Sequence, residues 1–167
     1  VSPREAPATN VTRAGGVAVA SRAFTVPPVG ATRAMDPDWR RAEIPAANGH
    51  GNARSIVRAQ TPMANGGKAF GKRILSEAGV RRVFEQQSSG TDLVLGIPVN
   101  FGMGYGINNP LMPIGPNKHI AYWGGYGGSI VLIDQDARLC VSYVMNRMEP
   151  GTTGDVRGLS PVMAAYQ

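Results

Sequence analysis

Three apolar runs in the last third of the chain constrain its fold more than any other feature of the sequence. They are IAYW at 120–123, SIVLID at 129–134 and LCVSYVMN at 139–146, and they are rich in β-branched or aromatic residues. Only the polar segment QDAR at 135–138 separates the second run from the third. Such spacing is typical of a β-hairpin. The sequence therefore predicts an antiparallel sheet built around these runs.

A helix is expected well before these strands. Asn52 is a good N-cap, and the apolar residues after it recur at near-helical spacing. The segment Asn65-Gly66-Gly67 supplies a stop, which predicts a helix over 53–64. Pro62 lies inside this pattern and should kink or shorten the helix.

The remaining elements follow in separate runs. A second helix begins with Ser76 as its cap and ends at Ser88-Ser89-Gly90. Strands are expected at LVLGIP (93–98) and FGMGYGI (101–107), and the glycines of the latter share one face, which indicates close packing of another backbone or bulky group. A final helix begins with Ser160 as its cap and Pro161 at its first position. The fold class is therefore α/β of the α+β type, with an antiparallel sheet flanked by helices.

Residues 1–38 have a different character from the rest. They contain five prolines and few periodic apolar positions, and only GGVAVASRAF at 15–24 is suited to a short ordered element. Long irregular stretches are uncommon inside compact domains. We expect this segment to pack on a missing N-terminal half of a larger protein, and residues 39–167 to form the C-terminal α/β portion of a domain.

Composition excludes several classes of function. The net charge is +6, but the basic residues are scattered, with only three adjacent pairs, so no nucleic-acid partner is expected. No run approaches the roughly 20 apolar residues of a membrane span, so no membrane partner is expected. Two histidines and one cysteine give no metal-ligand spacing, and no cofactor is expected. Cys140 is interpreted as a buried small apolar residue. A lone cysteine and the lack of a signal pattern favour the cytoplasm.

The run WGGYGGS at 123–129 places four glycines beside two aromatic residues. Taken by themselves, these residues favour a β-bulge and turn, with Trp123 and Tyr126 in the core. The alternative is that another molecule approaches the bare backbone here.

Three segments together resemble a known family. They are RRAEIPAANGHGNARSIVR at 40–58, GTDLVLGIPVNFGMGYGI at 90–107 and YWGGYGGSIVLIDQDARLCVSYVMNRM at 122–148. In this order they are similar to the C-terminal half of the β-lactamase-like serine hydrolases called family VIII esterases, which are related to class C β-lactamases and penicillin-binding proteins. The resemblance covers residues 39 to about 166. It implies a β-lactamase/transpeptidase-like fold, of which this chain is the C-terminal portion only.

The resemblance also implies that the nucleophile lies outside this chain. In the family, a serine and a lysine in an S-x-x-K motif and a tyrosine carry the acyl chemistry, and all precede the region seen here. In this chain no serine has a lysine three positions later, and no tyrosine has an asparagine two positions later. We expect a fragment, or one half of a split protein, that is inactive by itself.

Trp123-Gly124-Gly125 matches the W-G-G form of the family's third motif, which is K-T-G in lactamases. The resemblance implies that the backbone N–H of Tyr126 is an oxyanion-hole donor, and that Trp123 and Tyr126 shape an acyl or alcohol pocket. Tryptophan in place of the lysine favours uncharged esters over penicillin-like acids.

Two of four further residues, His50 and Asn146, have two open interpretations each. By position in the resemblance, Asn48 lines the pocket. His50 is either a polar contact or proton relay, or it holds its own loop. Asn146 either orients the W-G-G strand or caps the turn at 148–151. His119 is interpreted as an exposed loop residue.

The expected function is hydrolysis of carboxylic esters through an acyl-enzyme. The alternatives are a catalytically empty fragment that acts as a binding module, and an acyltransferase on the same fold. The expected partners are a small ester substrate, and either a separate N-terminal half chain or a second copy, because a sheet edge at SIVLID or FGMGYGI would otherwise be open.

Overall fold

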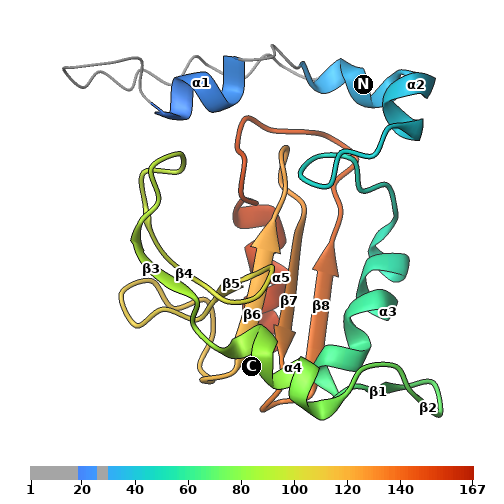
Figure 1. Cartoon of the computed structure of the whole chain (residues 1–167), viewed down its shortest axis with the longest axis vertical. Helices are drawn as coiled ribbons and strands as arrows, with labels where there is room; N and C mark the ends of the chain where they lie inside the picture. The colour runs from blue at the N-terminus through green and yellow to red at the C-terminus, as the bar shows by residue number, and fades with distance from the viewer. Residues whose placement is uncertain (1–18, 26–29) are drawn as a thin grey trace.

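The fold is known from a computed structural model, which describes residues 19–25 and 30–167. In this part of the chain the main sheet is antiparallel, as the sequence predicted, and its strands are found to lie in sequence order (Figure 1). The strands are β3 (Ser88–Thr91), β4 (Pro98–Phe101), β5 (Gly106–Ile107), β6 (Ile120–Gly124), β7 (Ile130–Asp134) and β8 (Leu139–Tyr143). The edges of this sheet are therefore β3 and β8. The expectation of an open edge at SIVLID is wrong, because β7 pairs with β6 on one side and with β8 on the other.

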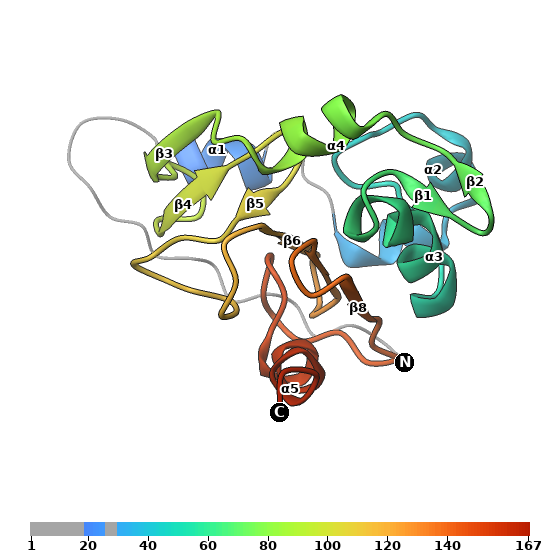
Figure 2. The ribbon, with the colours of Figure 1, turned by 90° about the horizontal axis from the view of Figure 1, so that it is seen from below.

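Helices cover both faces of the sheet, which confirms the predicted class. The helix α3 (Ala53–Ala64) contacts β7 and β8, α4 (Glu77–Phe84) contacts β6, and α5 (Val156–Ala164) contacts β7 and β8. Figure 2 shows α5 on one side of the sheet and α3 and α4 on the other.

Side chains alternate between the two faces of the sheet along the paired strands, and each face forms an apolar core. Ala121, Ile133 and Cys140 lie opposite one another across three strands and pack with residues of α3 and α4. The neighbouring residues Leu132 and Val141 pack on the other face, against α5. Cys140 is half-buried in the first core, as interpreted from the sequence, and burial raises the pKa of its thiol to about 11.

Local signals at the start of two helices are confirmed. The Asn52 side chain accepts the N–H of Ser55 at 2.9 Å, and the Ser55 hydroxyl accepts the N–H of Asn52 at 3.0 Å, which forms a reciprocal capping box. The helix runs through Pro62 and ends at Ala64. Ser76 caps α4 by accepting the N–H of Gly79 at 3.0 Å.

The segments between α4 and β6 differ from the prediction. Residues 88–91 are β3 rather than a helix stop, and residues 93–97 are the tip of the β3–β4 hairpin rather than a strand. At this tip Asp92 accepts the N–H groups of Val94 and Leu95 at 2.8 Å each, and such Asx turns compete with strand pairing.

The run 101–107 is a tight turn between two strands and not a single strand. A Cβ atom at Gly102 would overlap the carbonyl of Val83 at the end of α4, and Gly104 has a φ of +81°. Close packing on this run therefore occurs at Gly102, against a backbone, and at Gly106, against the rings of Tyr122 and Trp123, but not at Gly104.

The last helix begins earlier than predicted. Its cap is Asp155, which accepts the N–H of Arg157 at 2.9 Å, and Ser160 lies inside the helix, where its hydroxyl donates to the carbonyl of Val156. Aspartate and serine are about equally good caps, and Ser160 cannot serve as one because the helix has already begun at Val156.

Short elements lie outside this main body. Residues 68–69 and 72–73 form the small hairpin β1 (Lys68–Ala69) and β2 (Lys72–Arg73), which the sequence did not suggest. Of the segment expected to be irregular, residues 1–18 and 26–29 lie outside the described residues. The remainder holds α1 (Val19–Thr25), the 3₁₀ helix η1 (Ala31–Met35) and the beginning of α2 (Pro37–Arg41). No helix in the described ranges has the length and apolar character needed to cross a membrane.

A buried carboxyl group joins the sheet to two other elements. Asp134, at the end of β7, is 0% exposed. It accepts hydrogen bonds from the Asn117 amide at 2.8 Å, the Tyr166 hydroxyl at 2.7 Å and the Ala137 N–H at 2.9 Å. Burial, and then the bond to Asp134, raises the pKa of Tyr166, so its hydroxyl stays protonated and donates.

Candidate active site

The W-G-G motif lies at the end of β6, where one edge of the strand is open. On one side, Trp123 pairs with Val131 and Gly124 pairs with Ile130. On the other side, β5 reaches only as far as Tyr122, which pairs with Gly106. The backbone from Trp123 onward therefore has no neighbouring strand on the β5 side within the described residues.

Two backbone donors of the turn after β6, the N–H groups of Tyr126 and Ser129, have no partner among the described residues. The N–H groups of Gly125, Gly127 and Gly128 donate to backbone carbonyls at 2.8, 2.9 and 3.2 Å. The N–H of Tyr126 donates to no group among residues 19–25 and 30–167. Because each backbone N–H is a strong hydrogen-bond donor, the free N–H of Tyr126 can bind an acceptor from outside.

Contacts with another segment of the same chain, and positive φ angles, explain why glycines occupy this turn. A Cβ at Gly124 would overlap the carbonyl of Thr153, and a Cβ at Gly128 would overlap the carboxylate of Asp155. Gly127 and Gly128 also have φ angles of +92° and +119°, which other residues rarely adopt. The segment that approaches the bare backbone is therefore the loop before α5.

The aromatic residues of the motif are not core residues. Tyr126 is 38% exposed, and Trp123 is half-buried. The Trp123 ring lies 5.3 Å from the Phe101 ring, centroid to centroid, and a Cβ at Gly106 would lie 3.3 Å from it. The interpretation of these two residues as core is wrong, because Tyr126 is exposed and Trp123 is only half-buried among the described residues.

Trp123 lines an open pocket of about 500 Å³. The other lining residues come from β3, β4 and the turn before β5: Gln87, Ser88, Phe101, Gly102, Met103, Gly104 and Tyr105. Sequence reasoning placed Phe101 and Met103 on a strand face and missed their place beside Trp123. Only the pairing of β5 with both β4 and β6 brings them together.

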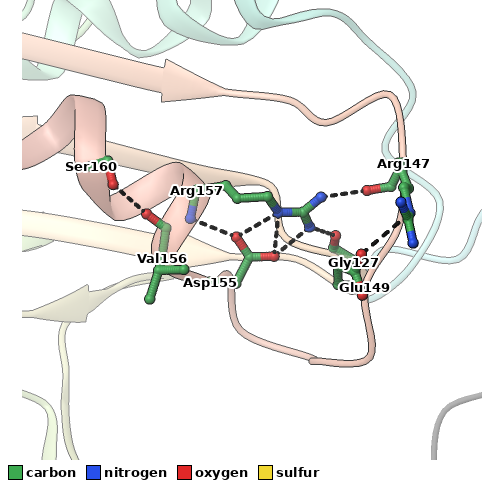
Figure 3. Close-up of polar contacts among 7 residues, drawn as sticks. All are labelled: Gly127, Arg147, Glu149, Asp155, Val156, Arg157 and Ser160. Atoms are coloured by element: carbon green, nitrogen blue, oxygen red, sulfur yellow. Dashed lines mark hydrogen bonds and ion pairs between the residues drawn. The ribbon is translucent and has the colours of Figure 1, made fainter.

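An ion pair missed by the sequence analysis supports the turn from the opposite side (Figure 3). The Arg157 guanidinium binds the carboxylate of Asp155 and donates to the carbonyls of Arg147 at 2.7 Å and Gly127 at 2.9 Å. The hydrogen bond from the Arg157 side chain is the largest cause that lowers the pKa of Asp155. No short motif marked this pair, since its carbonyl partners are 10 and 30 residues away.

The other predicted residues lie apart from this pocket's lining. The Asn48 amide donates to the carbonyls of Trp39, at 2.6 Å, and Ala42, and its oxygen lies 2.7 Å from Nε2 of the exposed His50. These contacts favour a role in holding the loop before α3, and the pocket and relay roles remain predictions.

No hydrogen bond among the described residues supports either predicted role of Asn146. Asn146 is exposed, and its side chain makes no hydrogen bond with the described part of the chain. His119 lies before β6, is partly exposed, and binds Asp136 through Nδ1 at 2.8 Å. The described residues hold no group of three His, Cys, Asp or Glu side chains placed to bind a metal.

A family model and a curated relative are similar to this chain. The family model described as beta-lactamase matches residues 2–160, and therefore extends across the boundary at residue 38 suggested by the sequence. The esterase/beta-lactamase LipL of Mycobacterium tuberculosis is 37% identical over 110 residues, which are 64% of this chain and 24% of that protein.

Two solved structures are similar over most of this chain. A family VIII carboxylesterase has a TM-score of 0.79 and 37% identity, with 86% of this chain and 39% of that chain covered. A penicillin-binding protein homologue from Caulobacter crescentus has a TM-score of 0.77 and 32% identity, with 91% and 41% covered. This chain spans about a quarter to two fifths of the length of these relatives. The chain belongs to the beta-lactamase family, which confirms the resemblance carried by residues 40–58, 90–107 and 122–148.

Proposed function

We propose that the complete protein is a serine carboxylesterase that works through an acyl-enzyme, and that this chain supplies the oxyanion side of its active site. The observation that carries the proposal is the free N–H of Tyr126, which follows the open end of β6 and lies three residues after Trp123 of the pocket lining. The relatives named as an esterase/beta-lactamase and a carboxylesterase support the same reaction class.

In this reaction a serine oxygen attacks the ester carbonyl and forms a tetrahedral oxyanion. The Tyr126 N–H stabilises this charge if the oxyanion comes within about 3 Å of the nitrogen. The alcohol then leaves with a proton, and water hydrolyses the acyl-enzyme to release the acid and restore the serine. The nucleophile and its lysine base come from the S-x-x-K half, because the present sequence contains no such motif.

The pocket favours uncharged substrates. Its lining includes Phe101, Met103 and Trp123, and no lysine or arginine. A carboxylate placed there would lose its hydration without gaining a cation, which is unfavourable. We therefore propose neutral esters with apolar acyl or alcohol groups as the substrate class.

We expect the complete protein to hydrolyse p-nitrophenyl butyrate with a burst of one p-nitrophenol per active site, and to react with a fluorophosphonate probe. This chain by itself should do neither. A matched substrate that carries a carboxylate on its acyl group should react more slowly. The proposal is contradicted if the complete, folded protein neither takes up the probe nor hydrolyses any ester. Faster release with an added alcohol, together with the transesterified product, would favour the acyltransferase alternative.

We also propose that the open edge of β8 binds a strand of the S-x-x-K half. In the described residues β8 pairs only with β7, and the hydroxyl of Ser142 on β8 is buried without a hydrogen-bond partner. An open edge and an orphaned hydroxyl both favour a missing neighbour.

Amide hydrogen exchange can test this second proposal. In the isolated chain, the outward-facing amides of residues 139–143 should exchange fast, and those shared with β7 slowly. Addition of the S-x-x-K half should protect the fast set and give a one-to-one complex in native mass spectrometry. If these amides are already protected in a monomer of 17.6 kDa, the edge has no need of a partner.

A further inference from the structure

The carbonyl of Gly127 receives two hydrogen bonds from a different part of the chain. Nη2 of Arg157 donates to it at 2.9 Å, and the N–H of Glu149 donates to it at 3.1 Å. The N–H of the same residue, Gly127, donates to the carbonyl of Gly151 at 2.9 Å. Both polar groups of Gly127 are therefore anchored on the loop between β8 and α5 or on α5 itself, and Figure 3 shows the bond from Arg157 to its carbonyl.

Tyr126 lies between this anchored residue and a second one. The N–H of Gly125 donates to the carbonyl of Ser129 at 2.8 Å. The carbonyl of Gly125 accepts the N–H groups of Gly128 and Gly154 at 3.2 and 3.3 Å. The direction of the Tyr126 N–H follows from the two anchored residues beside it. Since the turn is built from glycines, which have the largest backbone freedom, it depends on such anchors for a defined geometry.

Arg157 is placed to act on the turn rather than only on its own helix. Asp155 caps α5 through the backbone N–H of Arg157, and this cap requires no arginine side chain. The guanidinium instead extends to two carbonyls of other segments, and it is only 31% exposed. A Cβ at Gly128 would overlap both members of the ion pair, so the pair lies directly against the turn.

We propose that Arg157, held by Asp155, is a positioning residue that fixes the W-G-G turn so that the Tyr126 N–H points at the oxyanion. This inference rests on the proposed function and names a residue that acts through Gly127 rather than on the substrate. Arginine suits the task because its planar, multidentate group serves one carboxylate and two carbonyls at once, whereas a lysine ammonium offers a single point charge.

The effect on catalysis is tested in the complete enzyme. Arg157→Ala should lower kcat roughly 10- to 100-fold with KM within about twofold, because a displaced donor weakens binding of the transition state alone. Arg157→Lys should recover part of this loss. Asp155→Asn keeps an equally good helix cap but removes the charge, and should lower kcat several-fold. Rates are normalised to the fraction labelled by the fluorophosphonate probe, which removes any loss of folded enzyme.

Arg147→Ala is the matched control. Arg147 lies on the same loop, but its side chain pairs only with the Glu149 carboxylate among the described residues. Its kcat should stay within about twofold of the parent enzyme. An unchanged kcat in Arg157→Ala, or an equal loss in Arg147→Ala, would overturn the proposal.

A second readout is independent of activity. In the isotope-labelled parent chain and its Arg157→Ala variant, the amide resonance of Tyr126 should shift, and the amides of Gly127 and Glu149 should exchange faster. These changes should be absent in Arg147→Ala. If the complete parent enzyme hydrolyses no ester, the proposed function fails. The positioning role of Arg157 is then judged by the amide resonances alone. Unchanged resonances in Arg157→Ala overturn it.

Discussion

Tyr126→Pro is expected to lower kcat for ester hydrolysis by the complete enzyme roughly 100- to 1,000-fold, the usual cost of one lost oxyanion-hole donor. Proline removes the backbone N–H at this position and no other donor of the turn. The N–H is otherwise unused within the described residues, so the substitution breaks no hydrogen bond there. Tyr126 also has no positive φ, and a proline does not conflict with its backbone on that ground.

Tyr126→Ala separates the backbone donor from the side chain. The alanine variant keeps the N–H and loses a phenol ring that is 38% exposed, so its kcat should fall by less than about fivefold. Both variants are compared by active-site titration and by thermal unfolding, to show that the turn is intact. Equal losses in the two variants would assign the effect to the tyrosine ring, and no loss in Tyr126→Pro would remove this N–H from the oxyanion hole.

Asp134→Ala is expected to lower the free energy of unfolding by roughly 3 to 5 kcal/mol, because each buried donor left unpaired costs about 1 to 3 kcal/mol. The substitution leaves the Asn117 amide, the Tyr166 hydroxyl and the Ala137 N–H without their shared acceptor. Those donors belong to the loop before β6, the end of the chain after α5, and the turn after β7. Urea unfolding with a constant m-value measures the change.

Two controls define the origin of that loss. Tyr166→Phe removes one of the three bonds and should cost about 1 to 2 kcal/mol. Asp136→Ala, in the same turn, removes a partly exposed carboxylate that binds His119 and should cost less than about 1 kcal/mol. A loss below about 1 kcal/mol in Asp134→Ala would contradict the assignment of Asp134 as the junction of these elements.

The candidate site was predictable where the chemistry lies in consecutive residues. Trp123-Gly124-Gly125 and the position of Tyr126 stand in one short run, and the resemblance of this run to a family motif needs no knowledge of distant contacts. Arg157 could not be found in this way. An arginine two residues after an aspartate is common at the start of a helix, and only its reach to Gly127 gives it a place in the site.

Two strand predictions failed in part, also because of contacts that the composition of the run does not report. The run LVLGIP has strand-like composition, but Asp92 before it captures two N–H groups and forms a turn. In FGMGYGI the alternation suggested one strand, while the chain turns between β4 and β5 and packs Gly102 against the end of α4. Composition describes which residues suit a strand, and it does not report what lies against them.

Sequence patterns predicted the class of the fold, the caps at Asn52 and Ser76, the β7–β8 hairpin and the location of the motif. These features depend on contacts between residues at most a few positions apart, or on an alternation that a single strand already contains. The three-dimensional contacts were needed to show which strand edges are open, why Gly124 and Gly128 must be glycine, and how Arg157 and Asp134 join distant segments. Steric overlap and hydrogen bonding act through space, here between residues 17 to 32 positions apart, and no local pattern encodes such contacts.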